Sequence, residues 1–235
     1  MAIPRRSQLI SALVTTLVLA IIGGVAVFVL TRPSSDGDDR VTPFVPTAAD
    51  PDPSMRIPGV VRHFYQGGHV GPGKRVRYQF SPPMGGRHDA VWAVCTGIVY
   101  PRAIRSENAV HSMEHGATWV TYDPARVNAA GVAVLAAKVR GRDHLLMSPY
   151  PGLDRPVSIQ SWGHQLKVDS PSDPRIDHFI TATKQNPQKN VYPEQPTFRA
   201  HPEVGGTCAA NGVFDVADPP AFEPPPLPAD AVPDA

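Results

Sequence analysis

Residues 117–124 read Ala-Thr-Trp-Val-Thr-Tyr-Asp-Pro, which joins a strand pattern to a helix start. The first six of these residues are mostly β-branched or aromatic, and such side chains favour strands. Asp123 followed by Pro124 is typical of a helix N-terminus, because Asp accepts hydrogen bonds from free N–H groups and Pro fits the first turn. We therefore predict a strand at residues 117–122 and a helix that begins at Asp123 and ends before Gly141. The apolar stripe of that helix consists of Val127, Leu135 and Val139.

Further strand patterns lie on both sides of this stretch. Val76, Tyr78 and Phe80 alternate with polar residues, which is typical of a strand with one face in water. The other segments with strand character are residues 91–100, 144–147, 157–162 and 165–168. A second Asp-Pro pair, at residues 173–174, predicts a second helix up to residue 186. Strands outnumber helices, so the sequence predicts an α+β fold, with one compact domain on a mostly antiparallel sheet with two helices.

The N-terminal part of the chain has the features of a membrane anchor. Residues 9–30 contain no charged side chain, and at about 1.5 Å rise per residue a helix of this length crosses the hydrocarbon core of a bilayer. The run is longer than the apolar part of a cleavable signal peptide. Arg5 and Arg6 precede it, so the positive-inside rule predicts a cytoplasmic tip at residues 1–8. We therefore expect a single-pass protein of the plasma membrane with a single transmembrane helix and an extracytoplasmic main domain.

The segments on either side of the expected domain are rich in proline. Residues 31–58 combine Pro with Asp, Ser and Thr, which is the composition of an extended linker. Residues 209–235 hold many of the 28 prolines of the chain, which predicts a Pro-rich disordered tail. The folded extracytoplasmic domain is therefore predicted at residues 59–208.

Charge and cysteine content limit the classes of function and partner. The chain has 22 Lys and Arg against 21 Asp and Glu, a formal net charge of +1, which provides no general attraction for nucleic acid. The membrane, reached through the N-terminal helix, and a protein of the cell envelope are the partners that the sequence allows. The two cysteines are Cys95 and Cys208. In an oxidising compartment a disulfide between them is favoured over two free thiols or two thiolates on a soft metal.

The residues best suited to chemistry form the segment His-Ser-Met-Glu-His-Gly at 111–116. On a helix, His111 and His115 would lie one turn apart beside Glu114, as in the H-x-x-E-H motif of inverted zinc peptidases. In an extended segment, His111, Met113 and His115 would point the same way and suit a copper ion. The strand pattern that follows favours the extended or turn phase. A third interpretation is that both imidazoles only hydrogen-bond polar neighbours.

A second polar segment adds to the metal-binding interpretation. Residues 81–88 place two prolines before two glycines, a loop suited to hold Met84 and His88 at a defined place. His63 and His69 precede this loop, so five of the nine histidines fall between residues 63 and 115. The candidate metal ligands are His88, His111 and His115, assisted by Glu114, Met113 and His69.

The same motifs resemble a family of membrane-anchored actinobacterial proteins known as domain of unknown function 3105, over roughly residues 59–208. The resemblance rests on residues 82–88, Cys95, Gly97, Tyr100, residues 110–116, Tyr122, Pro124, residues 148–151 and residues 161–163. Members of the family more usually carry Leu at the position of Met113, which implies that a thioether is not a necessary ligand. The set that the resemblance implies is His88, His111, Glu114 and His115, which suits Cu(II) or Zn(II) as readily as Cu(I).

These observations lead to three hypotheses about function. The first is an extracytoplasmic module that binds a transition metal, copper first and zinc second, for sequestration or delivery. The second is a structural or interaction protein of the cell envelope, in which the histidines serve the fold. The third is a zinc hydrolase with Glu114 as general base, which requires a helix through residues 111–115. The distances between the histidine side chains distinguish these hypotheses. Ligand atoms that are each about 2 Å from one ion must lie within about 4 to 5 Å of one another.

Overall fold

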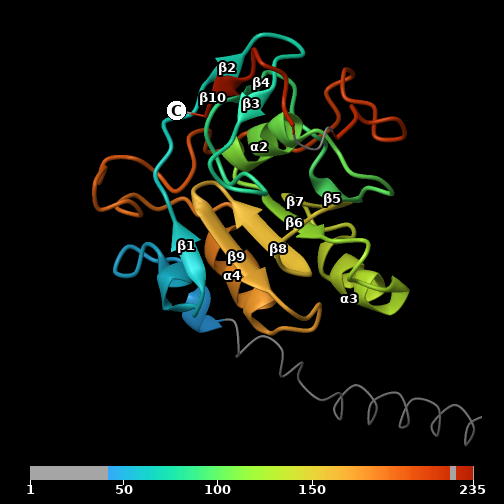
Figure 1. The fold of residues 1–235 in the computed structure, drawn as a ribbon. Coiled ribbons are helices and arrows are strands. Elements are labelled where there is room, and N and C mark those ends of the chain that lie inside the picture. Colours follow the sequence, from blue (N-terminus) through green and yellow to red (C-terminus); the bar gives the residue numbers. More distant parts are fainter. Residues whose placement is uncertain (1–41, 223–225, 235) are drawn as a thin grey trace, which may run out of the picture. The chain divides into compact units, whose positions relative to one another are not determined.

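A six-stranded mixed sheet forms the centre of the computed structural model, which describes residues 42–222 and 226–234 (Figure 1). The order of the strands is β1 (Val60–Arg62), β9 (His164–Val168), β8 (Val157–Ser161), β6 (Thr118–Tyr122), β7 (Leu145–Pro149) and β5 (Thr96–Val99). Neighbours from β1 to β6 are antiparallel, whereas β7 is parallel to both β6 and β5. The α+β class is confirmed. The sheet is mixed instead of mostly antiparallel, because α3 (Ala129–Val139) joins β6 to β7 as a crossover helix.

Among the described residues three α-helices accompany the sheet, one more than the two predicted for the domain. α3 begins at Ala129 and not at Asp123, because Asn128 caps it by accepting a hydrogen bond from Gly131 N at 3.0 Å. α4 (Arg175–Thr183) follows the second Asp-Pro pair, as expected, and ends before residue 186. The two Asp-Pro pairs therefore correctly indicated α3 and α4. They did not give the first residue of α3, which lies more than one helical turn after Asp123.

The additional helix is α2 (Ser106–Glu114), which carries most of the segment that was expected in an extended or turn phase. That prediction was wrong. All nine residues of α2 are buried, so packing stabilises this short helix where local propensity would not. Its side chains also hydrogen-bond the preceding segment. Asn108 Nδ2 donates to Val91 O, and Ser112 Oγ donates to Ala93 O, each at 2.6 Å.

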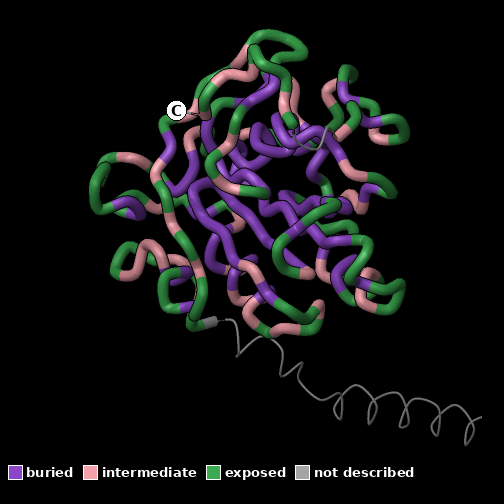
Figure 2. The backbone as a smooth tube through the Cα atoms, viewed as in Figure 1, coloured by how far each residue is buried: buried purple, intermediate pink, exposed green. Residues whose placement is uncertain are grey.

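Apolar side chains cover both faces of the sheet. Trp119 and Leu146 belong to the core that contains the apolar residues of α2. Val120 and Leu145 belong to the core on the other face, which contains the apolar residues of α3 and α4. This alternation follows the two-residue period of a strand. Figure 2 shows the resulting buried centre, with exposed loops around it.

Part of the predicted linker is folded in the structure. Within the linker, the structure differs from an extended spacer over residues 42–58. It contains the 3-10 helices η1 (Thr42–Phe44) and η2 (Pro53–Arg56), and Ile57 is only 2% exposed within the core. The cytoplasmic tip predicted at residues 1–8 and the span predicted at 9–30 lie outside the described residues. Among the residues that are described, no helix combines the length and apolar character needed to cross a bilayer.

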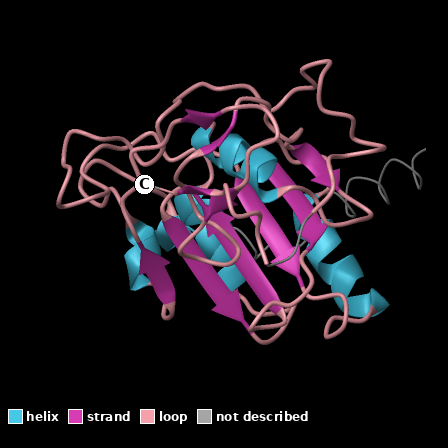
Figure 3. Ribbon diagram, turned by 45° about the horizontal axis from the view of Figure 1, so that its top comes forward, coloured by secondary structure: helices cyan, strands magenta, loops and turns pink. Residues whose placement is uncertain are grey.

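The predicted tail also contributes to the fold in its described part. Phe214 is buried in the core beside α2. The strand β10 (Val232–Pro233) pairs in parallel with β3 (Val76–Arg77), which is shorter than the strand predicted for this segment. Proline suppresses regular structure along a segment, yet a few apolar side chains are enough to fix it against a core. Figure 3 shows how much of the described chain outside the central sheet is loop.

Cys95 and Cys208 form the predicted disulfide, with their Cα atoms 4.6 Å apart. The bond joins residues separated by 113 positions in sequence. Cys95 N also donates to Cys208 O at 3.1 Å. The segment around residue 208 is thereby attached to the residues that lead into β5.

Candidate metal centre

The short parallel pair β2 (His69–Val70) and β4 (His88–Asp89) places two histidines side by side. His69 is opposite His88 in the register, and their ring centroids are 5.1 Å apart. The side chain of His88 is completely buried, whereas that of His69 is 48% exposed. The glycine pair before His88 is required by close packing, since a Cβ on Gly85 would lie 2.4 Å from the ring of Tyr65.

Helix α2 supplies the other polar side chains from one side. His111 and Glu114 are three positions apart, and His115 is the C-cap residue, so all three lie over neighbouring turns. Met113 is fully buried among the apolar residues of the core, together with Ala109 and Val110 of the same helix. The thioether was expected to assist the metal, but the helical phase directs it to the core. Met84, the other soft ligand considered, also belongs to this core.

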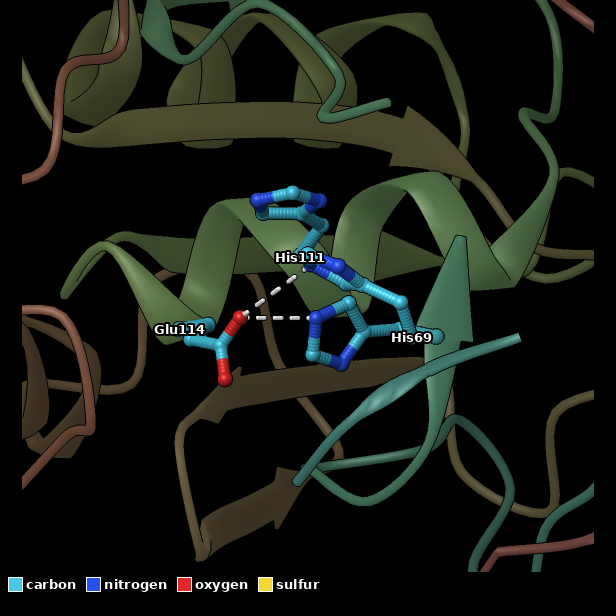
Figure 4. Close-up of side chains that lie close together, drawn as sticks. His69, His111 and Glu114 are labelled. Atoms are coloured by element: carbon cyan, nitrogen blue, oxygen red, sulfur yellow. Dashed lines mark ion pairs between the residues drawn. The ribbon is translucent and has the colours of Figure 1, made fainter. Parts of the chain in front are cut away.

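Four of the predicted ligands come together between α2 and the β2–β4 pair. The four residues are His69, His88, His111 and Glu114. Each offers one ligand atom, and these four atoms all lie within 4.8 Å of one another. The shortest contact joins His88 Nε2 to Glu114 Oε2 at 2.7 Å, and His69 Nε2 is 3.9 Å from the same oxygen. Figure 4 shows the side chains of His69 and Glu114 directed toward each other, with His111 on the same helix as Glu114. We call this set the inner group.

Backbone carbonyls fix the orientation of three imidazole rings. In each ring the Nδ1 atom contacts a carbonyl oxygen, which only accepts hydrogen bonds, so Nδ1 carries the proton. These bonds join His88 to Gly86 O at 2.9 Å, His111 to Asp89 O at 2.7 Å and His115 to Thr207 O at 2.7 Å. In the neutral form each Nε2 then keeps a free lone pair. Metal-binding histidines are held by the same kind of outer hydrogen bond.

The contact between His88 and Glu114 is short but is not aligned as a hydrogen bond. His88 Nε2 is fully enclosed, and among the described residues it has no partner that meets hydrogen-bond geometry. It nevertheless lies 2.7 Å from the carboxylate of Glu114. A lone pair and a carboxylate oxygen at this distance repel each other unless a cation lies between or beside them.

Burial and neighbouring charge shift the pKa values of His111 and Glu114. Burial is the main reason that the pKa of His111 falls to about 4, and the nearby His88 and His115 lower it further against the opposing hydrogen bond to Asp89. Burial alone would raise the pKa of Glu114. The close contact and the charge of His88 outweigh burial, with smaller contributions from the other histidines, and the pKa of Glu114 is lowered. Neutral imidazole and ionised carboxylate are the forms that bind metal ions.

His115 belongs to a second set, which includes a residue that the sequence did not reveal. Its Nε2 atom is 3.1 Å from His111 Nε2 and 3.0 Å from Glu203 Oε2. These three residues also bring one ligand atom each within 4.8 Å of one another. We call them the outer group, because the side chain of Glu203 is 51% exposed. Glu203 lies in a loop without a motif, far along the chain from α2, so no local signal pointed to it.

A third set of potential ligands is less suited to a metal. It consists of Asp143, His144 and Cys208. The sulfur of Cys208 is in the disulfide, so it is not a thiolate. The described residues therefore offer two groups built from histidine and glutamate, with His111 common to both.

The fold and this centre define an α+β domain that carries a buried histidine–glutamate cluster between a helix and a two-stranded sheet. The chain belongs to the family described as Protein of unknown function (DUF3105), whose model matches residues 69–200, more than half of the chain. This match confirms the resemblance noted from the motifs, and it spans every residue of the inner group. Neither a curated protein nor a solved structure matches the chain significantly.

Proposed function

We propose that this protein is a membrane-anchored metal-binding protein whose extracytoplasmic domain binds a divalent transition metal ion through the inner group, His69, His88, His111 and Glu114. The observation that carries the proposal is the orientation of the buried rings. His88 Nε2 lies 2.7 Å from the carboxylate of Glu114, the Nδ1 atoms of His88 and His111 donate to carbonyls, and one ring nitrogen of His111 lies within 4.8 Å of the other ligand atoms. Three nitrogen donors and one oxygen donor make a set that first-row transition metals favour.

Copper is the first ion proposed, as Cu(II), and zinc is the second. The interpretation in favour of Cu(I) relied on thioether ligands, and both Met84 and Met113 pack in the core. Imidazole and carboxylate donors suit Cu(II) and Zn(II), and Cu(II) binds most tightly among the divalent first-row ions. The side chain of His69 is 48% exposed, which gives the ion a route from solvent. Sequestration or delivery at the cell surface is the role that fits such a site.

The location of the domain outside the membrane rests on the sequence. The apolar run at residues 9–30, with arginines before it, supports an N-terminal anchor with a cytoplasmic tip. The disulfide between Cys95 and Cys208 fits an oxidising compartment.

A purely structural role for the histidines accounts for less of the geometry. A protonated His88 would pair with Glu114, and that pair could serve the fold without a metal. Such a pair would normally align its N–H with the carboxylate, which these two groups do not. It would also leave the contact between His111 Nε2 and His115 Nε2 at 3.1 Å unexplained.

The hydrolase hypothesis meets most of one requirement, because α2 is helical from Ser106 to Glu114 and His115 is its C-cap residue. Its other residue-specific requirement is a Glu114 carboxylate available to act as base on a metal-bound water. In the structure that carboxylate contacts His88 directly, at 2.7 Å. Glu114 is therefore assigned to the ligand set, and binding is the function that the geometry supports best.

Metal analysis of the purified full-length chain tests the proposal. The chain is incubated with excess Cu(II) or Zn(II), dialysed, and measured for metal per chain by plasma mass spectrometry. We expect the His88→Ala variant to bind one ion fewer than wild type. His178→Ala is the matched control, since His178 stacks on Phe44 away from the centre. Equal metal content in wild type and His88→Ala would refute the inner site.

A further inference from the structure

The inner and outer groups share only His111, and this suggests that they serve two ions. The inner group without His111 still contains two histidines and one glutamate, namely His69, His88 and Glu114. The outer group also contains two histidines and one glutamate, namely His111, His115 and Glu203. Two histidines and one carboxylate are a sufficient protein ligand set for a zinc ion, with water in the remaining position.

A single ion cannot use both groups. His111 Nδ1 donates to Asp89 O at 2.7 Å, so His111 has one lone pair, on Nε2, and binds one ion at a time. His115 and Glu203 fall outside the inner group, because their ligand atoms are not all within 4.8 Å of its members. An ion in the inner group therefore leaves His115 and Glu203 for a second one.

The outer group is held as firmly as a metal site requires. His115 Nδ1 donates to Thr207 O at 2.7 Å, which fixes its tautomer. The ring packs between Trp92, with centroids 5.0 Å apart, and Gly206, where a Cβ would lie 2.6 Å from Cγ of the ring. The backbone N–H of Glu203 donates to Glu114 O at 3.1 Å, which attaches the Glu203 loop to the end of α2.

The distances within the outer group fit shared coordination. Two ligands of a tetrahedral zinc ion, each about 2.0 to 2.1 Å from the metal, are about 3.3 Å apart. His115 Nε2 lies 3.1 Å from His111 Nε2 and 3.0 Å from Glu203 Oε2. Both Nδ1 atoms are already donors, so the two neutral rings have no proton to share between their Nε2 atoms. A metal ion removes the repulsion between the two lone pairs.

We infer that His111, His115 and Glu203 bind a second divalent metal ion beside the first, which then retains His69, His88 and Glu114. This inference rests on the proposed function, because it presupposes an ion in the inner group. The half-exposed carboxylate of Glu203 places the second ion at the solvent side of the pair. The centre is therefore binuclear when it is fully loaded.

Zinc stoichiometry of the full-length chain tests this inference. Wild type and three variants are equilibrated with excess Zn(II), dialysed, and measured for zinc per chain. Glu203→Gln removes an outer ligand from an exposed side chain with little risk to folding, and His88→Ala removes an inner one. Glu194→Gln is the matched control, because Glu194 is an exposed glutamate outside both groups. We expect two zinc ions in wild type and in Glu194→Gln, and one in each of the other variants.

The other outcomes separate the two proposals. One zinc ion in wild type and in Glu203→Gln, with none in His88→Ala, would refute the second site and leave the inner site in place. One ion in wild type that is lost in both Glu203→Gln and His88→Ala would also refute the second site, because a single ion would then depend on both groups. No zinc in wild type, together with no copper after loading with Cu(II), would refute both proposals. A spectroscopic readout adds to the count, since Cu(II) ions at adjacent sites weaken each other's paramagnetic resonance signal, and Glu203→Gln would restore an isolated signal.

Discussion

His111 Nε2 lies 3.1 Å from His115 Nε2, although each ring already donates its Nδ1 proton to a backbone carbonyl. The two residues are about one helical turn apart in sequence, at the C-terminal end of α2. Each carries a lone pair in the neutral ring, so the contact favours a cation and disfavours the empty pair. His111 therefore belongs to both the inner and the outer group.

Replacement of His111 should affect whichever ion uses it, which is the inner ion when that ion binds alone and the outer ion when both are bound. We expect His111→Ala to weaken a first Zn(II) ion at the inner position and a second one at the outer position, each by more than about tenfold, because each loses a ligand. Competition with a chromophoric chelator would measure both affinities. An effect restricted to one of the two ions would show that His111 belongs to that ion alone.

The close packing of Gly206 against His115 provides a test that leaves every ligand in place. A Cβ at residue 206 would lie 2.6 Å from Cγ of the His115 ring, so Gly206→Ala must displace the ring. We expect the variant to lose about ten- to a hundredfold in affinity for the outer ion, as is usual when the support of a ligand is disturbed. The inner ion should be retained. The measurement is the same chelator competition.

Gly71→Ala is the matched control for this variant. A Cβ at Gly71 would meet only the side chain of Lys74, at 3.8 Å. Both glycines adopt backbone conformations that alanine tolerates, since neither has a positive φ. Equal affinities for the outer ion in Gly206→Ala and Gly71→Ala would contradict the role given to His115.

Met113→Leu should leave metal binding unchanged. Met113 is fully buried in the core and not among the inner ligands, and Leu has a similar volume. A swap of this kind usually costs less than about 1.5 kcal/mol of stability. Copper and zinc content per chain, together with the midpoint of urea unfolding, would test both expectations. A loss of copper alone in this variant would return the thioether to the ligand set.

The sequence was sufficient for the elements whose signals are local. The strand pattern of residues 117–122 corresponds to β6, and the Asp-Pro pair at 173–174 precedes α4. The disulfide followed from there being only two cysteines. Each of these depends on a run of neighbouring residues or on a count, which are properties that one sequence displays.

The features that were missed depend on contacts between distant segments. α2 is short and wholly buried, and its side chains hydrogen-bond residues near 91–93. The phase of the His111 segment was therefore decided by packing, which overrode the local preference for an extended chain. Glu203 contacts His115 from a loop that lies far along the chain from α2. The parallel pairing that sets His69 opposite His88 likewise has no counterpart in local pattern.

Loss of the disulfide should reduce both stability and the support of His115. The bond spans 113 positions, and on the chain-entropy model a closed loop of about a hundred residues stabilises by about 4 to 5 kcal/mol. We expect the double variant Cys95→Ser, Cys208→Ser to unfold at a markedly lower urea concentration. Thr207 orients His115 and is the neighbour of Cys208 in sequence. The affinity of the double variant for the outer ion should therefore also fall. Unchanged unfolding would contradict this account of the fold.

Asp52 lies in the segment that was predicted to be a linker, yet it is a buried acceptor. Its side chain is 7% exposed and accepts from Arg62 Nη1 at 2.8 Å, with His164 Nε2 at 3.2 Å from the same oxygen. Burial opposes ionisation, but the hydrogen bond and charge of His164 and the hydrogen bonds of Ser54 and Arg62 outweigh it and lower the pKa of Asp52 from 3.8 to about 2. The ionised form is thus stabilised by the fold.

This lowered pKa predicts how stability changes with pH. The contribution of Asp52 is fully present above its unfolded pKa, near 4, and is lost as the pH falls toward the folded value of about 2. We expect Asp52→Asn to lower the free energy of unfolding by about 2 kcal/mol at pH 7, and by progressively less below pH 4. Asp50→Asn is the control, because the ion pair of Asp50 with Arg56 is largely exposed and should contribute under about 1 kcal/mol. Urea unfolding of wild type and both variants between pH 2 and pH 7 would measure the difference. If Asp52→Asn were as stable as Asp50→Asn at pH 7, residues near 52 would be a spacer after all, and the domain would begin nearer β1.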